Sequence, residues 1–369
     1  PFSDAAHKMA VLAPSLSGML SNKSLVKLRS MDDVLVVGGA GYIGSHMVAL
    51  LNKKGLRVTT LDNLYSGHRD AVKFGDFVFG DMGDEENVAA LLKERSISTI
   101  VHLAGSISVA ESIRDPAEYY LNNTSKTLNL ASVAARSGVK RFIFSSTAAV
   151  YGNPIEIPLD ERHPKHPVNP YGRSKWLSEL ALPDFEAAYG MQYMSFRYFN
   201  ASGASPQLGL GERHNPETHL IPSALHAALG KRGCLTINGT DWGTPDGTCV
   251  RDFLHVEDLC EAHYLGYRAL LGGCSSGAYN LGTGRGHSVR EVVETASQVS
   301  ECEIPVAYGP RRPGDPPSLV ANPEAAMRKL GWRPKRSDLR SIVEDAWVWE
   351  QHRAGGIPLE QLLHENKVA

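Results

Sequence analysis

The most informative stretch of the chain is residues 34–46, which read Val-Leu-Val-Val-Gly-Gly-Ala-Gly-Tyr-Ile-Gly-Ser-His. The apolar run at its start predicts a strand that is buried on both faces, as in parallel sheets covered by helices. Gly38, Gly41 and Gly44 then allow a sharp turn into a helix whose first N–H groups favour an anion such as a diphosphate. The spacing G-x-x-G-x-x-G differs from the basic dinucleotide fingerprint G-x-G-x-x-G, so a Gly-rich turn without a ligand remains an alternative.

The segment after this loop supports dinucleotide binding. A helix is expected over about residues 42–54, and a second strand over residues 57–61 that ends in Asp62. An acidic residue roughly 20 positions beyond the glycine loop can accept hydrogen bonds from an adenosine ribose and would repel a 2′-phosphate. The sequence therefore predicts NAD in preference to NADP, although His68 and Arg69 lie close enough to leave NADP open.

From residue 31 to about residue 200, short β-branched runs alternate with amphipathic stretches, which predicts a doubly wound parallel sheet. Asp81 follows the expected strand at residues 77–79 and is a candidate partner for the adenine amine; its alternative role is the N-cap of a helix from Asp84 onward. Further strands are expected at residues 99–103 and 141–147, with one long helix between them that begins at residues 111–123 and ends at Ser137.

The stretch that carries chemistry is Tyr171-Gly-Arg-Ser-Lys175. On a helix these two side chains lie one turn apart on the same face. A nearby ammonium, together with the positive charge of an oxidised nicotinamide, favours the phenolate and so lowers the pKa of the tyrosine toward the range of a general base. Tyr-x-x-x-Lys also arises by chance, and its functional meaning here depends on the glycine loop upstream and on the strand that ends in Ser145, Ser146 and Thr147.

After residue 200 the chain has longer loops rich in Gly, Pro and Asp. Strands are expected at residues 235–237, 278–281 and 306–308. A helix is expected over residues 288–299 with a capping box of Ser288 and Glu291, and another follows Asn322 with Pro323 at its first position. Two arginine-containing loops, residues 250–252 and 309–315, are candidates for phosphate binding, with solvated surface as the alternative.

Composition limits the class of protein. The 369 residues carry a formal net charge of −2, which gives no field for non-specific binding to nucleic acid or to an anionic membrane. No stretch approaches 18 uninterrupted apolar residues. The five cysteines have no C-x-x-C and no metal-ligand spacing, so we expect free thiols in a reducing cytoplasm and no metal.

Residues 1–30 differ from the rest, because four basic residues face a single acid among many Ser, Leu and Ala. A targeting peptide can look like this, but the segment lacks a compact apolar core with a clean cleavage site. We therefore expect a leader, or an extension added for expression, ahead of Met31, and exclude it from the fold.

These residues together closely resemble the UDP-glucose/UDP-galactose 4-epimerases of the extended short-chain dehydrogenase/reductase superfamily. The resemblance runs from about Asp33 to beyond Trp349 and covers nine motifs in order. The motifs are Gly38 to His46, Leu61-Asp-Asn63, Gly80-Asp81, Tyr119-Tyr-Leu-Asn-Asn123, Ser145 to Gly152, Tyr171 to Lys175, Arg197-Tyr-Phe-Asn200, Asp246 to Asp252 and Arg311-Arg-Pro-Gly-Asp315.

The resemblance implies a mechanism. Ionised Tyr171 takes the proton of the sugar's 4-hydroxyl while NAD accepts hydride from C4; the 4-keto sugar then turns over, and hydride returns to its other face. Thr147 hydrogen-bonds the same oxygen, and Lys175 also holds the nicotinamide ribose. The resemblance also implies a cofactor site of Gly38, Gly41, Tyr42, Ile43, Gly44, Asp62, Asn63, Asp81, Met82, Leu103, Ala104, Gly105, Asn122, Tyr171, Lys175 and Tyr198. It implies a UDP-sugar site of Thr147, Asn200, His219, Leu220, Arg251, Arg312, Asp315 and Leu319.

Further expectations follow from the same resemblance. Residues 31–200 would form the NAD-binding Rossmann domain, and residues 201–369 mainly a smaller α/β domain for the UDP-sugar, with some segments returning to the first. A homodimer is expected. Four positions depart from the best-known members: Ile107 replaces a Lys, His219 an Asn, Asn238 an aromatic residue and Leu319 a Tyr that lines the sugar pocket.

Three other functions compete with UDP-hexose epimerisation. A 4-epimerase acting mainly on UDP-N-acetylhexosamine or UDP-pentose would carry the same motifs. A 4,6-dehydratase of the same superfamily would carry an Asp-Glu pair after the strand-end Thr, where this chain has Ala148-Ala149. An NAD(H)-binding regulatory protein would keep the glycine loop and tend to lose the Tyr and Lys, both of which are present.

Overall fold

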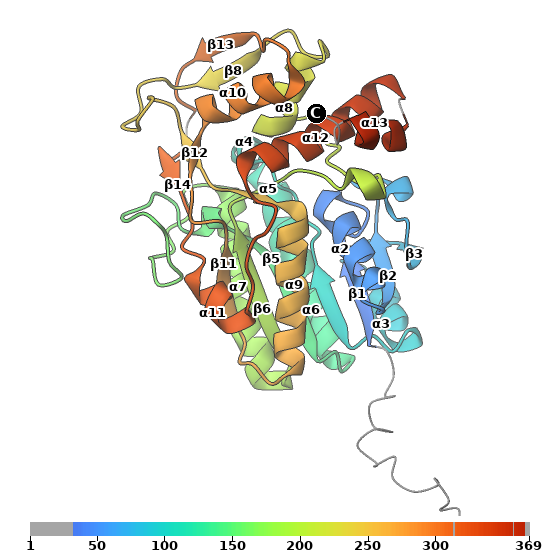
Figure 1. Ribbon diagram of the computed structural model, residues 1–369. Coiled ribbons are helices and arrows are strands. Elements are labelled where there is room, and N and C mark those ends of the chain that lie inside the picture. The colour runs from blue at the N-terminus through green and yellow to red at the C-terminus, as the bar shows by residue number, and fades with distance from the viewer. Residues whose placement is uncertain (1–31, 313, 357, 366–369) are drawn as a thin grey trace, which may run out of the picture. The chain divides into compact units, whose positions relative to one another are not determined.

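The computed structural model describes residues 32–312, 314–356 and 358–365, and Asp32–Ala369 forms one compact unit (Figure 1). The expected leader, residues 1–30, lies outside the described residues. Every helix in the described ranges is too short or too polar to cross a membrane. All five cysteines carry free thiols, as the sequence predicted.

The centre of the unit is a seven-stranded parallel sheet with the order β11-β6-β5-β4-β1-β2-β3. The doubly wound fold is therefore confirmed. The edge strand β11, which is the last of the seven in the sequence, comes from the part of the chain after residue 200. The strands are β1 (Asp33–Val37), β2 (Arg57–Asp62), β3 (Asp76–Phe79), β4 (Thr99–His102), β5 (Arg141–Thr147), β6 (Gln192–Tyr198) and β11 (Gly277–Leu281).

Helices cover both faces of this sheet. Alternate residues of β1 face opposite sides, and because residues 34–37 are all apolar, both faces must be buried. Val34 and Val36 pack into one core with α2 (Tyr42–Lys53) and α9 (Val256–Leu271). Leu35 and Val37 pack into a second core against the other three helices. Those helices are α3 (Glu85–Glu94), α6 (Lys126–Arg136) and α7 (Pro170–Tyr189).

The expected long helix before Ser137 is interrupted. Residues of that region form α4 (Val109–Arg114), α5 (Pro116–Tyr119), the π-helical turn η3 (Tyr120–Ser125) and then α6. The break falls at Asp115, because the next residue, Pro116, has no N–H to continue the preceding helix. The Asp115 side chain then caps the next helix by accepting a hydrogen bond from the Glu118 N–H. A π-helical turn within a helix frequently marks a functional site.

The part of the chain from residue 200 onward adds three small sheets, β8–β13, β12–β9–β14 and β10–β7. In Figure 1, β8, β13, α8 and α10 lie together, and they share a separate apolar core. The remaining elements are η2 (Arg69–Ala71), η4 (Ala148–Val150), β7 (Asn200–Ser202), η5 (Pro206–Leu208), α8 (Leu220–Ala228), β8 (Leu235–Asn238), β9 (Val250–Arg251), β10 (Phe253–His255), β12 (His287–Ser288), α10 (Val289–Ser300), β13 (Val306–Gly309), β14 (Ser318–Leu319), α11 (Glu324–Leu330), α12 (Leu339–Gly355) and α13 (Leu359–Glu365).

Two expected helix starts can be compared with the structure. The capping box of Ser288 and Glu291 is present at the start of α10. Pro323 is the N-cap of α11 and not its first residue, because Glu324 is the first residue with helical geometry. The expectation for Pro323 was wrong by one position.

Candidate active site

The glycine loop between β1 and α2 is closely packed on one side and open on another. A Cβ on Gly38 would lie 2.5 Å from the Ala104 nitrogen, and one on Gly44 would lie 2.0 Å from the Gly38 oxygen. A Cβ on Gly41 would meet only the Gly38 oxygen, at 3.4 Å. Gly41 is also the N-cap of α2, where no side chain caps the first N–H groups. The loop thus leaves helix N–H groups available to a diphosphate.

Asp62 lies at the end of β2, where the sequence placed it, and it supports the glycine loop. Its carboxylate accepts hydrogen bonds from the Ala40 nitrogen at 2.9 Å and the Leu64 nitrogen at 2.8 Å. A carboxylate offers about four acceptor positions, so capacity remains for ribose hydroxyls. The structure adds a second role that the sequence had not indicated, which is to hold the loop.

Asp81 does not cap the following helix. Asp84 is the N-cap of α3, so that alternative for Asp81 was wrong. The Asp81 carboxylate accepts from Lys126 Nζ at 2.8 Å and from Asn63 Nδ2 at 2.9 Å. Although partial burial acts to raise its pKa, these hydrogen bonds and the charge of Lys126 hold the pKa of Asp81 below its usual value. The adenine contact stays a prediction.

Tyr171 lies in the first turn of α7, and the Asn169 side chain fixes that turn by accepting the Gly172 N–H at 2.8 Å. Burial raises the pKa of Tyr171 above its usual value, and the interaction with the Thr147 hydroxyl opposes that rise. These two effects are the ones resolved for Tyr171 in the protein alone, so the expected lowering by Lys175 together with a bound nicotinamide stays a prediction. The expectation also counted the charge of an oxidised nicotinamide, which the protein does not contribute.

Lys175 is almost fully buried, at 3% exposure. Its ammonium lies 5.1 Å from the centre of the Phe144 ring, and burial lowers the pKa of Lys175 to about 8. The buried neighbour His102 stays neutral, because burial and the charge of Lys175 lower the pKa of His102 to about 3. Within the described ranges Lys175 has no carboxylate partner, and its Nζ donates no hydrogen bond. Its donors are therefore available to a ligand.

A second unsatisfied group lies beside it. The Tyr198 hydroxyl is buried and has no hydrogen-bond partner among the described residues. Burial raises the pKa of Tyr198, the nearby Ser145 hydroxyl opposes that rise, and the negative charge of an ionised Tyr171 would raise it further. Ser145 is therefore near enough to interact weakly with the Tyr198 hydroxyl. The free donors of Lys175 and the open side of Gly41 fit a bound NAD.

Asn123, which was not among the expected site residues, organises this region. Its Oδ1 accepts from the Ser106 nitrogen at 2.8 Å, and its Nδ2 donates to Ser174 Oγ at 3.2 Å. A Cβ on Gly105 would lie 2.9 Å from Asn123 Oδ1 and 3.0 Å from Lys175 Nζ. The expected residue, Asn122, donates to Ser106 Oγ at 2.9 Å. Both come from the π-helical turn η3, which the sequence pattern could not distinguish from a regular helix.

The structure also contains a buried ion pair next to the site that the sequence did not predict. Arg197 Nη2 donates to Glu179 Oε2 at 2.6 Å, with both side chains at most 5% exposed. The Ser146 hydroxyl also donates to Glu179, and Arg197 Nη1 donates to the Tyr151 hydroxyl at 3.0 Å. Because Ser146 precedes Thr147 and Glu179 lies one turn after Lys175, the network fixes the end of β5 against α7.

On the predicted sugar-nucleotide side, the structure brings three residues together. The Asp315 carboxylate lies 3.8 Å from Arg251 Nη2 and 3.2 Å from Arg312 Nε. Asn200 Nδ2 donates to the Asp252 oxygen at 2.9 Å, so it lies next to the same segment. Two guanidinium groups share one carboxylate, which leaves a net positive charge for a diphosphate.

Leu319 connects this group to the catalytic residues. It is paired in register with Arg251. Its side chain packs on an apolar cluster that contains Ala148, Val150 and Tyr151, which follow Thr147 directly. The position of Leu319 is therefore consistent with the expected role in lining the sugar pocket.

His219 and Leu220 lie elsewhere, at the start of α8. The recorded partners of His219 are carboxylates, Glu212 Oε1 at 2.8 Å and Glu217 Oε1 at 3.0 Å, and not the arginines. Although burial opposes it, the charge of Glu212 raises the pKa of His219 to about 10. His219 is thus a cation at neutral pH.

The other predicted residues occupy supporting positions. The Tyr42 hydroxyl donates to the Gly203 oxygen at 2.6 Å. Ile43 and Leu103 pack at the edge of the core beneath α2 and α9, and Met82 and Ala104 pack in the core on the opposite face.

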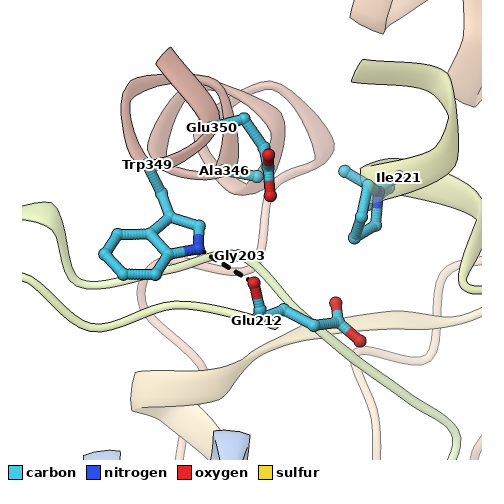
Figure 2. A pocket seen from close by; sticks show the side chains of 7 residues that line it. Gly203, Glu212, Ile221, Ala346, Trp349 and Glu350 are labelled. Carbon is cyan, nitrogen blue, oxygen red and sulfur yellow. Dashed lines mark hydrogen bonds between the residues drawn. The ribbon is translucent and has the colours of Figure 1, made fainter. Parts of the chain in front are cut away.

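A small cavity lies between the loop at Glu212, α8 and α12. Figure 2 shows a cavity lined by residues that include Gly203, Glu212, Ile221, Trp349 and Glu350, and its volume is about 10 Å³. A space of that size holds about one water and not a nucleotide.

Comparisons with known proteins agree with this arrangement. Residues 34–282 match the family model of the NAD dependent epimerase/dehydratase family. The UDP-glucose 4-epimerase of Halalkalibacterium halodurans is 46% identical over 327 residues, which are 89% of this chain and 98% of that protein.

Solved structures give the same result. The crystal structure of a UDP-glucose 4-epimerase from Brucella ovis in complex with NAD superposes with a TM-score of 0.84 and 45% identity, over 86% of this chain and 97% of that one. The UDP-glucose 4-epimerase from Bifidobacterium longum in complex with NAD+ and UDP gives a TM-score of 0.82 and 36% identity, over 88% of this chain and 100% of that one.

Proposed function

The chain belongs to the NAD-dependent epimerase/dehydratase family, and from this premise we propose which of its residues carry out the reaction. The activity is NAD-dependent inversion of C4 of a UDP-hexose. We assign Tyr171 as the general base and Thr147 as its partner on the sugar's 4-oxygen. The observation that carries this assignment is the half-buried Tyr171 beside Thr147, one helical turn from Lys175, which has no ion-pair partner among the described residues.

Bound NAD supplies the redox chemistry, by taking hydride from C4 and returning it to the opposite face of the 4-keto sugar. Tyr171 accepts the proton of the 4-hydroxyl on its phenolate oxygen and gives it back when the hydroxyl forms again. Thr147 donates a hydrogen bond to the same sugar oxygen. The buried network of Glu179 and Arg197 keeps these two side chains in place.

Lys175 has two tasks in this proposal. Its ammonium holds the nicotinamide ribose, and its charge favours the phenolate of Tyr171. Burial alone raises the pKa of Tyr171, so the protein needs a positive charge at this position to make the base usable near neutral pH. The lowered pKa of Lys175, about 8, still leaves it largely protonated at pH 7.

The diphosphate site follows from charge. Arg251 and Arg312, on either side of Asp315, offer guanidinium groups to the UDP-sugar, and Asn200 lies next to them. Residues 31–200 thus carry the NAD and residues 201–369 most of the sugar nucleotide. UDP-galactose and UDP-glucose are the main substrates in this proposal, with UDP-N-acetylhexosamine and UDP-pentose as the alternatives.

We also propose a homodimer in the cytoplasm. The large apolar side chains Ile113, Leu121, Leu177 and Leu180 are between 44% and 59% exposed on α4, η3 and α7, which contact one another. Exposed apolar surface of this kind favours association. Free thiols fit a reducing compartment.

The assignment is tested with Tyr171→Phe. The variant keeps the ring and loses the base, so kcat should fall about 10²-fold or more while the affinity for UDP stays unchanged. A Phe variant within a few fold of the wild-type rate would contradict the assignment. The substrate class is tested separately, by NMR identification of the products formed from UDP-hexoses, UDP-N-acetylhexosamines and UDP-pentoses.

A further inference from the structure

Four potential metal ligands converge in the loop before α8. Glu212, His214, Glu217 and His219 each offer one ligand atom, and these atoms all lie within 4.8 Å of one another. The carboxylates are nearly buried, with side-chain exposures of 6% and 7%. Neither the catalytic assignment nor the arginine site uses Glu212, His214 or Glu217.

The four imidazole–carboxylate separations are close to those of a tetrahedral metal site. Both imidazoles turn Nδ1 toward both carboxylates. From His219 the distances are 2.8 Å to Glu212 and 3.0 Å to Glu217; from His214 they are 3.0 Å and 3.9 Å. Four ligands at zinc bond lengths of about 2.0–2.2 Å are about 3.3–3.6 Å apart. The four imidazole–carboxylate separations lie on both sides of that value, and all ligand atoms lie within 4.8 Å of one another.

Surrounding contacts hold the ligands in position. Glu217 Oε1 accepts from the Thr218 and His219 nitrogens, each at 2.8 Å. The Glu212 oxygen accepts from Trp349 Nε1 at 2.9 Å, and Figure 2 shows its carboxylate extending away from that indole. Such contacts orient ligands and raise metal affinity.

The loop also joins distant parts of the fold. Arg213 forms an ion pair with Asp70, with Nη2 and Oδ1 2.6 Å apart, and its oxygen lies 3.0 Å from His68 Nε2. Trp349 belongs to α12. A metal here would therefore fix one loop between the segment after β2 and α12.

We propose that Glu212, His214, Glu217 and His219 form a structural zinc site. Carboxylate and imidazole ligands suit Zn²⁺, and four protein ligands close the coordination sphere, which is typical of a structural site and not of a catalytic one. Binding of one divalent ion displaces the proton of His219 and balances the two buried carboxylates while both imidazoles are neutral. Its task is to fix the start of α8, which holds His219 and Leu220.

The test is zinc binding by the full chain. Chelator-treated protein should bind one Zn²⁺ per chain, and its thermal midpoint should rise when Zn²⁺ is added. Co²⁺ in place of Zn²⁺ should give the intense visible absorption of a four-coordinate ion. His214→Phe and Glu217→Gln should each weaken zinc binding at least 100-fold, since even residues behind the ligands change affinity 10- to 100-fold.

His166→Gln is the matched control, because His166 is an exposed histidine outside the cluster, and it should bind zinc as the wild type does. Circular dichroism shows whether the variants are folded. If one variant is unfolded, the zinc affinity of the other variant and the Co²⁺ spectrum of the wild type test the proposal. The proposal would be overturned by a failure to bind zinc stoichiometrically, by the absence of Co²⁺ absorption, or by equal zinc affinity in the folded variants. The cluster would then be a set of histidines hydrogen-bonded to carboxylates.

Discussion

Replacing Lys175 by Met should stabilise the NAD-free protein while it destroys activity. The lysine has no ion-pair partner among the described residues, and burial lowers its pKa from 10.5 to about 8. That difference corresponds to about 3 kcal/mol by which folding disfavours the charged ammonium. Methionine has a similar length and carries no charge.

The stabilisation depends on pH in a defined direction. An amine whose pKa is lower in the folded than in the unfolded protein destabilises the fold fully below the folded pKa, where both states are protonated. Between about pH 8 and pH 10.5 the unfolded state binds more protons, so stability rises with pH. The penalty in the wild type should fall from about 3 kcal/mol at pH 7 to about 1 kcal/mol at pH 10.

One favourable contact is lost with the charge. The ammonium lies over the Phe144 ring, and such cation–π contacts contribute about 0.5–1 kcal/mol at exposed sites and about 2 kcal/mol or more when desolvated. We therefore expect a net gain of about 1–2 kcal/mol at pH 7 for Lys175→Met. Activity should fall at least about 10²-fold, because the variant neither holds the ribose nor favours the phenolate of Tyr171.

The measurement is urea unfolding of protein stripped of NAD, at pH 7 and pH 10, for the wild type, Lys175→Met and Lys93→Met. Lys93 is an exposed lysine near the end of α3, and its variant should stay within about 0.5 kcal/mol of the wild type at both pH values. A Lys175→Met variant less stable than the wild type at pH 7, or a difference that does not shrink at pH 10, would refute the reasoning.

Three further variants test other parts of the site. Asp62→Ala should weaken NAD binding and relax the preference against NADP, and tighter binding of NADP than of NAD by the wild type would contradict the role of Asp62. Glu179→Gln should lower the free energy of unfolding by about 3–5 kcal/mol, because it leaves Arg197 buried without its charge partner; a loss below about 1 kcal/mol in urea unfolding would show that the pair is not structural. Leu319→Tyr should selectively suppress turnover of UDP-N-acetylhexosamine, which we expect at a lower rate than that of the plain hexoses, since a contact of this size changes discrimination by about 1–3 kcal/mol. Equal losses on both sugars, or no wild-type activity on the N-acetyl sugar, would show that Leu319 does not control the pocket.

The parts predicted well from sequence are those that depend on neighbours along the chain. The run of residues 34–37 forms the central strand, because four apolar residues in a row must be buried on both faces. The glycine loop, the acid that ends β2 and the capping box of α10 follow from local backbone geometry and short spacings. Tyr171 and Lys175 share a helix face because four residues make about one turn.

Local patterns failed where a choice depended on the surroundings. The pKa of Tyr171 rises because of burial, which spacing along a helix does not reveal. The Glu212 to His219 cluster lies within eight residues and contains no cysteine, so cysteine spacing does not reveal it. The pattern E-x-H-x-x-E-x-H was the signal that could have found it.

The sequence by itself determined the layered fold and the shared helix face of Tyr171 and Lys175, the two residues that we propose for the chemistry, since both follow from periods of a few residues. Only the tertiary structure decided that Asn123 meets Gly105 and Lys175, and that Glu179 pairs with Arg197. These contacts join segments 18 or more residues apart, and they form because the parallel strands end at one edge of the sheet and the helices pack across it. A buried charge must then find its partner or, as Lys175 does, remain available for a ligand.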